Sequence, residues 1–210
     1  MLLDDQECQL VLVDYQTRLM PAIFEGPLVL ANAVRLARMA QALQVPVFGT
    51  EQNPAKLGEN LPELRSVITE SRGRILAKMS FSACADGLAD CLRPPQRLAN
   101  TGGNARSLPK HLQKAVPPAD QPQRNSIVIA GCEAHVCLMQ TALELLEQEF
   151  EVWVVTDACG SRTERSRDAA FDRLAGSGAE LVTTEMVAFE WLRSCEHERF
   201  RAVLKLLKEG

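Results

Sequence analysis

Residues 126–137 read Ser-Ile-Val-Ile-Ala-Gly-Cys-Glu-Ala-His-Val-Cys, an apolar run that passes through a glycine into a polar turn. A short continuous apolar run is typical of a strand buried on both faces, as in a parallel sheet. A helix is predicted to follow, from about residue 135 to 148. The stretch therefore predicts a strand, a tight turn at Gly131 and a helix with Cys137 in its first turn.

The same alternation of patterns extends along the chain in both directions. Further short apolar runs predict strands at 10–13, 45–48, 74–78, 152–155 and 180–183. Helices are predicted at 28–43, 62–67, 86–92, 164–174, 185–192 and 198–207. Strands that alternate with helices form βαβ units with right-handed crossovers. We therefore expect an α/β fold: a three-layer, doubly wound, Rossmann-like sheet of six mainly parallel strands in the order 3-2-1-4-5-6.

The composition is that of an ordinary folded protein. The chain has 210 residues, 46% of them hydrophobic, which suits one domain over residues 1–210. The net charge is −4 and the basic residues are scattered, so no nucleic-acid partner is expected. No apolar run reaches the roughly 18 residues of a membrane span, so no membrane partner is expected either.

Cysteine usage and the chain start predict a cytoplasmic protein. The seven cysteines are odd in number and irregularly spaced, which is typical of reduced thiols. Residues 1–7 are acidic, unlike a secretory or transit peptide. With three histidines and no Cys-x-x-Cys pair, a structural zinc site is not expected.

One segment interrupts the alternation. Residues 93–125 contain six prolines and the run Thr-Gly-Gly-Asn at 101–104. A loop of this length is unusual inside a compact domain. Two interpretations stay open, a surface loop or insertion and an arm that contacts another subunit.

Cys137 is the candidate nucleophile. The amino end of a helix carries free N–H groups and partial positive charge. This position lowers the pKa of a thiol, and the same N–H groups can hold an oxyanion. A buried structural thiol fits the same residues, because free cysteine is among the most buried residue types.

Asp14 and Lys78 also come at the carboxyl ends of predicted strands. Ligands of doubly wound sheets lie outside these ends, so both residues are expected in one crevice with Cys137. Asp14 could accept the thiol proton, and the Lys78 ammonium could stabilise the thiolate. The alternatives are a turn-forming Asp14 and a solvated or salt-bridged Lys78. An acid, a cation and a thiol together form a set that activates a nucleophile.

Five other residues lie close to these positions in the sequence or fold. They could line a substrate pocket or be ordinary packing and loop residues: Tyr15, Gln16, Phe24, Gln52 and Phe81.

Five segments together resemble the isochorismatase-like cysteine hydrolases, and within them the isochorismatase domain-containing proteins. They are Leu-Val-Asp-Tyr-Gln at 12–16, Gly-Thr-Glu-Gln-Asn-Pro at 49–54, Ala-Lys-Met-Ser-Phe-Ser at 77–82, Ala-Gly-Cys-Glu-Ala-His-Val-Cys at 130–137 and Val-Thr-Asp-Ala-Cys-Gly-Ser-Arg at 155–162. The resemblance covers nearly the whole chain except residues 93–125. It implies a homo-oligomer, a dimer or larger, without indicating the order.

The resemblance implies a catalytic triad of Asp14, Lys78 and Cys137. It also implies a non-proline cis peptide bond between Cys132 and Glu133. That bond would aim the Glu133 N–H beside the Cys137 N–H, so that the two form an oxyanion hole.

The resemblance also bears on two neighbours of the nucleophile. Because the family pattern assigns proton transfer to Asp14, His135 is expected along the helix surface and not as the base. Cys132 is expected to be a packed apolar residue, although a disulfide with Cys137 could form on oxidation.

Two departures narrow the implied activity. Nicotinamidases of this superfamily carry metal-binding Asp and His residues after the second strand, where this chain has Glu-Gln-Asn-Pro at 51–54. We therefore expect no metal and no other cofactor. True isochorismatases cleave a vinyl ether without a thiol, whereas Cys137 favours attack on a carbonyl-type carbon.

The resulting hypothesis is a metal-independent cysteine hydrolase. Its substrate would be a small amide-like molecule, cleaved at a non-peptide C–N bond through a Cys137 thioester. Two alternatives stay open, a vinyl-ether hydrolase of the isochorismatase type and a low-activity scaffold or interaction protein that keeps the site.

Overall fold

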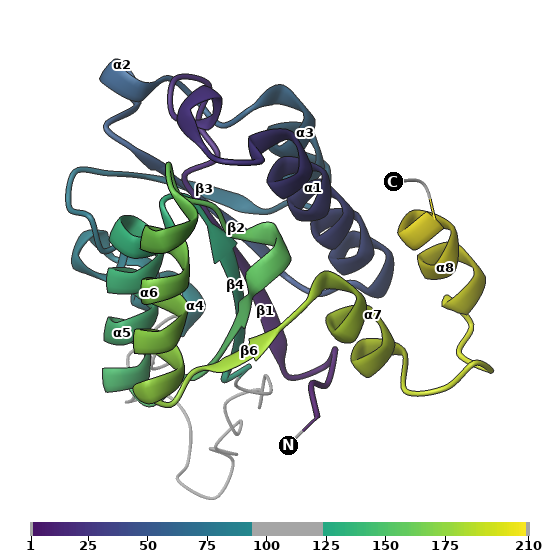
Figure 1. The fold of residues 1–210 in the computed structure, drawn as a ribbon. Coiled ribbons are helices and arrows are strands. Elements are labelled where there is room, and N and C mark those ends of the chain that lie inside the picture. Colours follow the sequence, from purple (N-terminus) through teal and green to yellow (C-terminus); the bar gives the residue numbers. More distant parts are fainter. Residues whose placement is uncertain (1, 94–123, 209–210) are drawn as a thin grey trace, which may run out of the picture.

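The computed structural model describes residues 2–93 and 124–208 of the chain. Its strands form a six-stranded sheet in the order β3-β2-β1-β4-β5-β6, and all neighbours pair in parallel (Figure 1). The strands are β1 (Cys8–Val13), β2 (Val47–Gln52), β3 (Arg74–Lys78), β4 (Ser126–Gly131), β5 (Glu151–Val155) and β6 (Glu180–Val182). The predicted fold class and strand order are confirmed.

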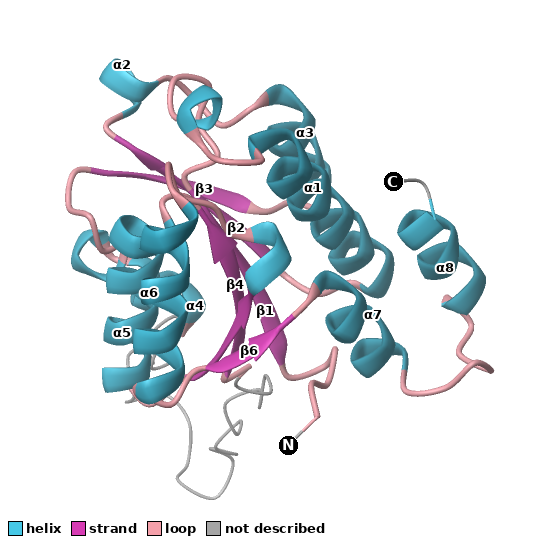
Figure 2. Ribbon diagram, in the orientation of Figure 1, coloured by secondary structure: helices cyan, strands magenta, loops and turns pink. Residues whose placement is uncertain are grey.

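Helices cover both faces of this sheet (Figure 2). One face carries α1 (Gly26–Leu43), α3 (Pro62–Glu70), α7 (Thr184–Leu192) and, packed outside α1, α8 (Phe200–Lys208). The other carries α4 (Leu88–Leu92), α5 (Met139–Glu147) and α6 (Glu164–Gly176). None of the helices in the described ranges is long and apolar enough to cross a bilayer. The proline-rich segment predicted at 93–125 lies almost entirely outside the described residues.

β1 and β4 form the centre of the sheet and are buried along their whole length. Their carboxyl ends meet where Val13 pairs with Gly131. A Cβ atom on Gly131 would lie 2.5 Å from both the Cβ atom and the carbonyl oxygen of Val13. Gly131 is therefore needed for this close approach and not for the unusual turn dihedrals that the sequence predicts, because it is the last residue of β4.

β2 begins later and ends later than the sequence predicts. Pro46 has no N–H to donate to a ladder, although its carbonyl accepts a 2.8 Å hydrogen bond from Leu10. The strand instead runs from Val47 to Gln52, and Gln52 pairs with Lys78 of β3. This shift places Thr50 and Gln52 inside the strand, on the same face, since alternate residues of a strand share a face.

Candidate active site

Asp14 follows β1 directly and adopts a left-handed backbone conformation, with φ of 57°. Asp tolerates this region better than most residues do. Its N–H donates to the Thr50 carbonyl at 3.3 Å, and its own carbonyl accepts from the Gln16 N–H at 2.8 Å. A residue in such a conformation, at a cost of about 1–3 kcal/mol, persists where the surrounding structure enforces it. The turn leaves the Asp14 carboxylate completely buried.

One carboxylate oxygen of Asp14 accepts a hydrogen bond, and the other lies against a cation without a hydrogen-bond donor among the described residues. The Lys78 ammonium lies 2.8 Å from Oδ2, and the Thr50 hydroxyl donates to Oδ1 at 2.7 Å. The side chains of Asp14 and Lys78 are both inaccessible to solvent. The alternative of a solvated Lys78 is therefore wrong, and the ion pair joins the carboxyl ends of β1 and β3.

Lys78 is surrounded by further acceptors. Its Nζ donates to Gln52 Oε1 at 2.7 Å and to the carbonyls of Phe81 and Ser80 at 3.0 and 3.3 Å. An ammonium group has three N–H donors, so these three acceptors saturate it, and Asp14 is held beside it by charge. The arrangement suits a cation that supplies positive potential to the site.

Cys137 lies in a short π-helix, η4 (Ala134–Leu138), which leads into α5. Its Sγ is 3.9 Å from Gln52 Oε1, and its residue surface is 6% exposed. Burial, with a smaller contribution from the Asp14 charge, raises the pKa of Cys137 to about 12 against the opposing Lys78 charge. The sequence predicts the opposite direction, because a helix amino end favours thiolate, but burial outweighs that effect. The resting thiol is neutral and interacts with both Asp14 and Lys78.

The loop before Cys137 is fixed to two neighbouring segments. The predicted cis peptide bond joins Cys132 and Glu133. The Cys132 N–H donates to the Val13 carbonyl at 2.9 Å, and the Ala134 N–H donates to the Gly160 carbonyl at 2.7 Å. Among the described residues the Glu133 N–H has no backbone acceptor.

The side chains of this loop contact the segment after β5. One Glu133 carboxylate oxygen accepts from the Arg162 N–H at 3.1 Å and from its Nε at 2.9 Å. His135 Nδ1 lies 2.9 Å from Ser161 Oγ. His135 is half-buried and is engaged with a buried serine hydroxyl. Cys132 is completely buried, as expected for a packed residue.

Tyr15 and Gln16, two of the predicted pocket residues, are completely buried. The Tyr15 hydroxyl donates to the Ala158 carbonyl at 2.6 Å. The Gln16 amide donates to the Gln52 and Gly58 carbonyls and accepts from the Gln52 N–H at 2.8 Å. These polar groups are satisfied within the protein, so both residues hold the loops around Asp14 in place.

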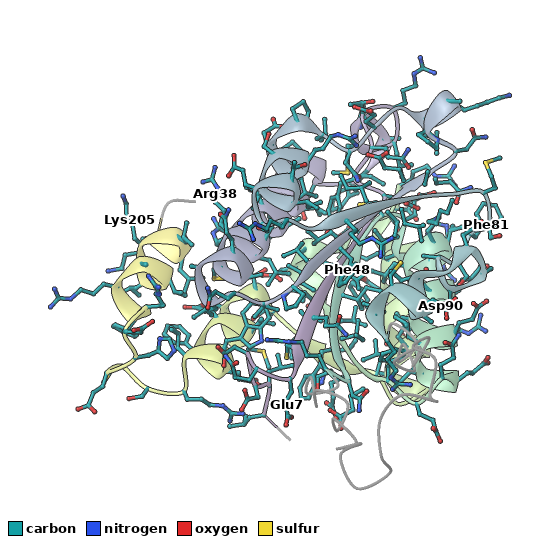
Figure 3. All side chains as sticks on the ribbon, turned by 180° about the vertical axis from the view of Figure 1, so that it is seen from behind. Glu7, Arg38, Phe48, Phe81, Asp90 and Lys205 are labelled. Carbon is teal, nitrogen blue, oxygen red and sulfur yellow. The ribbon has the colours of Figure 1, made fainter. Side chains whose placement is uncertain are left out.

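The other three predicted pocket residues have different positions. Gln52 lies between the ammonium of Lys78 and the thiol of Cys137, and its Nε2 donates to the Met79 carbonyl at 2.7 Å. Phe24 and Phe81 are 40% and 55% exposed, and Phe81 lies near the edge of the molecule in Figure 3. The Phe24 N–H donates to the Ser161 carbonyl at 2.9 Å. Gln52 is thus part of the central cluster, whereas Phe81 joins it only through its carbonyl, which accepts from Lys78.

Glu51, between Thr50 and Gln52, points to the opposite face of β2. Its carboxylate accepts from the Asn60 N–H at 2.9 Å and forms a short ion pair with Arg65. Among the described residues, no three or more His, Cys, Asp or Glu side chains are grouped so that they could hold a metal ion.

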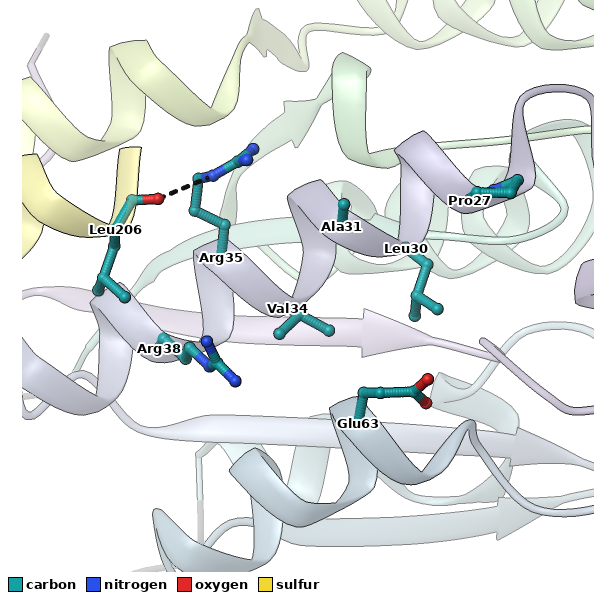
Figure 4. Close-up of a pocket in the computed structure, with 8 residues that line it drawn as sticks. All are labelled: Pro27, Leu30, Ala31, Val34, Arg35, Arg38, Glu63 and Leu206. Atoms are coloured by element: carbon teal, nitrogen blue, oxygen red, sulfur yellow. Dashed lines mark hydrogen bonds between the residues drawn. The ribbon is translucent and has the colours of Figure 1, made fainter. Parts of the chain in front are cut away.

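A hollow of about 280 Å³ lies away from these residues, between α1, α3 and α8 (Figure 4). Arg35 crosses one end of it, where Nε donates to the Leu206 carbonyl at 3.0 Å. Asp14, Lys78 and Cys137 do not line this hollow, whose walls are Pro27, Leu30, Ala31, Val34, Arg35, Arg38, Glu63 and Leu206.

The fold and the site define a class, a doubly wound α/β protein with a buried acid, lysine and cysteine at the carboxyl ends of β1, β3 and β4. Comparisons identify the family. Residues 119–186 match the model of the isochorismatase domain. Isochorismatase domain-containing protein 2 of Rattus norvegicus is 32% identical over 200 residues, which cover 95% of this chain and 80% of the relative. The chain belongs to the isochorismatase domain family, as its motifs predict, and the family indicates a hydrolase.

Two solved structures support the fold assignment. The MAR1 ribonuclease of Caenorhabditis elegans has a TM-score of 0.81 and 28% identity, and the match covers 99% of this chain and 92% of that one. The YcaC gene product of Escherichia coli, an octameric hydrolase of unknown specificity, has a TM-score of 0.78 and 24% identity. That match covers 99% of this chain and 89% of YcaC.

Proposed function

We propose that this chain is a metal-independent cysteine hydrolase of small amide-like substrates, with Asp14, Lys78 and Cys137 as its triad. The observation that carries the proposal is the fully buried Asp14–Lys78 ion pair next to the Cys137 thiol. A buried ion pair is weak evidence for a role in stabilising the fold, because the cost of removing both charges from water offsets their attraction. Ionisable groups with perturbed surroundings at the ligand-binding edge of a doubly wound sheet are typical of active sites.

The first step is attack by a thiol that is neutral at rest. Cys137 gives its proton to Asp14 while Sγ forms a bond to the substrate carbonyl carbon. The Lys78 ammonium favours the sulfur charge that develops during the transfer. Cys137 then loses its proton only as its sulfur attacks an electrophilic carbon, which is consistent with its raised pKa.

The carbonyl oxygen becomes an oxyanion, which the N–H groups of Glu133 and Cys137 stabilise. The C–N bond breaks, and the leaving nitrogen takes the proton held by Asp14. A water molecule then attacks the thioester carbon and gives a proton to Asp14. Asp14 returns that proton to the Cys137 sulfur as the acid product departs, which restores the resting site.

We further propose that Gln52 contacts the substrate and that Phe24 and Phe81 lie at its entrance. Tyr15 and Gln16 do not contact the substrate; they hold the loops around Asp14 in place. A cytoplasmic homo-oligomer that binds a small molecule stays our expectation for the whole protein.

The decisive test is turnover of a panel of small amides and ureides by wild type, Cys137→Ala and Cys195→Ala. Cys195 is exposed and serves as the matched control. We expect Cys137→Ala to abolish turnover and Cys195→Ala to retain it. Iodoacetamide should also label Cys137 faster than Cys84, whose pKa is likewise raised to about 12 and whose side chain is more exposed. Equal labelling of all seven thiols would falsify the proposal.

RNA cleavage is the second candidate, because the Caenorhabditis elegans protein is described as a ribonuclease. A single-stranded RNA therefore belongs in the panel. If wild type cleaves RNA but no amide, and Cys137→Ala does not cleave RNA, the proposed activity becomes phosphodiester cleavage in place of amide hydrolysis. Vinyl-ether hydrolysis that survives Cys137→Ala would indicate an isochorismatase-type reaction. A wild-type protein that turns over nothing but captures a stable partner would indicate the scaffold alternative.

A further inference from the structure

Thr50 contacts Asp14, the proposed base of the site, but is not one of the predicted site residues. It pairs with Val13 across the β1–β2 ladder, next to Asp14. Its side chain is completely buried, and its hydroxyl donates to Asp14 Oδ1 at 2.7 Å. The hydroxyl is thus the counterpart of Lys78, which holds the other oxygen at 2.8 Å.

The backbone of Thr50 is held from both sides. Its carbonyl accepts from the Asp14 N–H at 3.3 Å and from Asn60 Nδ2 at 3.0 Å. A β-branched side chain on a fixed backbone has restricted choice at χ1. The hydroxyl therefore has a defined direction, toward the same face as Gln52.

A carboxylate held through one oxygen can still rotate, since the terminal torsion of Asp is broad. A donor on the other oxygen removes that freedom. A hydrogen bond to the charged form of a carboxyl group also makes it a weaker base. Thr50 can therefore influence both the direction in which Asp14 accepts a proton and the ease with which it does so.

We propose that Thr50 is a positioning residue for the Asp14 base, and that its hydroxyl holds Oδ1 so that the carboxylate stays oriented toward Lys78 and the Cys137 thiol. This inference rests on the proposed function and deepens it. The titratable groups that face Asp14 are Lys78 from β3, Cys137 from η4 and Cys132 from the loop after β4. Substitution of Thr50 leaves all three in place.

The test measures iodoacetamide labelling of Cys137 as a function of pH, resolved by peptide mass spectrometry. Thr50→Val keeps the shape of the side chain and removes the hydroxyl. Thr50→Ser and Thr50→Ala form a matched pair, because both lack the methyl group and they differ only in the hydroxyl. We expect the acid limb of the profile to move up by about one pH unit in the Val and Ala variants, which is the size expected for a lost hydrogen bond to a charged group. Thr50→Ser should follow the wild type.

The inference is overturned if the Thr50→Val and Thr50→Ala variants melt cooperatively and their labelling profiles overlie that of the wild type. Thr50 would then be a packing residue. If Thr50→Val does not fold, the Ser and Ala pair decides. If Ala also fails to fold while Ser folds, the hydroxyl serves stability and the inference is again wrong. The proposed function fails separately, if wild-type Cys137 labels no faster than Cys84.

Discussion

The Lys78 ammonium and the Asp14 carboxylate form an ion pair of 2.8 Å in which neither side chain reaches solvent. Loss of one partner would leave an uncompensated charge in the interior, which costs about 3–5 kcal/mol. We expect Lys78→Met to lower the free energy of unfolding by that amount, measured by urea denaturation. The double variant Asp14→Asn, Lys78→Met should recover most of the loss, because it removes both charges and Asn tolerates the left-handed backbone at this position, and it should have no activity. A single variant as stable as wild type would contradict this account of the pair.

Tyr15 and Phe81 should respond to substitution in opposite ways. Tyr15→Phe removes the buried bond to the Ala158 carbonyl and leaves that acceptor unpaired, so stability should fall by about 1–2 kcal/mol. Phe81→Ala changes an exposed side chain, so its melting temperature should stay near that of wild type, while KM rises if the ring lies at the substrate entrance. Thermal melts and steady-state kinetics on one substrate compare the two variants. A Tyr15→Phe variant that is as stable as wild type but has a raised KM would show that Tyr15 lines the substrate pocket.

The fold and the convergence of the triad could be predicted because they depend on patterns that are local in the sequence. Apolar runs that alternate with helical segments determine the parallel sheet, and the carboxyl ends of its strands meet at one edge. Asp14, Lys78 and Cys137 each follow or end such a run, so their approach requires no knowledge of side-chain packing. The position of Gly131 at the end of an apolar run also predicts that a glycine is needed there, although the reason is the close approach to Val13 and not a turn.

The details that sequence reasoning missed depend on register and burial. In a strand that runs from Val47 to Gln52, Thr50 and Gln52 lie on the same face, so the sequence could have placed Thr50 in the site. Pro46 obscures the bounds of this strand in the sequence. Tyr15 has the residue type of a pocket wall, and only the tertiary structure shows its hydroxyl bonded to a core carbonyl. The raised pKa of Cys137 has the same origin, since the degree of burial that outweighs the helix end is set by packing.

Buried thiols should make the protein lose stability at alkaline pH. Burial raises the pKa of Cys8 to about 11 and of Cys159 to about 12, from an ordinary value of 9.0. The folded protein therefore keeps protons that the unfolded chain releases above pH 9. The stability that these thiols contribute is complete below pH 9 and is lost as the pH rises toward 12. The slope is about 1.4 kcal/mol per pH unit for each such thiol.

Urea midpoints measured between about pH 8 and 10.5 test this slope, a range that brackets the ordinary thiol pKa. Cys159→Ala removes one buried thiol and should flatten the decline, after allowance for its own effect at neutral pH. Cys195→Ala, at an exposed position, is the control and should keep the wild-type slope. A stability that is constant over this range would show that the buried thiols ionise in the folded state as easily as in the unfolded chain.

Arg162 should affect catalysis through the loop that carries the Glu133 N–H. Its side chain is 63% exposed, so its ion pair with Glu133 adds little to global stability. The pair nevertheless joins the segment after β5 to the residue proposed as an oxyanion donor. In Arg162→Gln the backbone hydrogen bond to Glu133 can persist while the Nε bond is lost, so the loop keeps its path with a less fixed carboxylate. We expect kcat to fall several-fold with KM and melting temperature little changed, because a donor to the oxyanion acts mainly in the transition state.

Arg165→Gln is the matched control, since Arg165 is exposed on α6 only three residues further along and loses the same charge. A fall in kcat of equal size in both variants would mean that long-range charge is responsible. A raised KM with unchanged kcat in Arg162→Gln alone would instead mean that the guanidinium binds the substrate directly. The split between kcat and KM therefore distinguishes a residue that positions the oxyanion loop from one that recognises a negatively charged substrate at the rim.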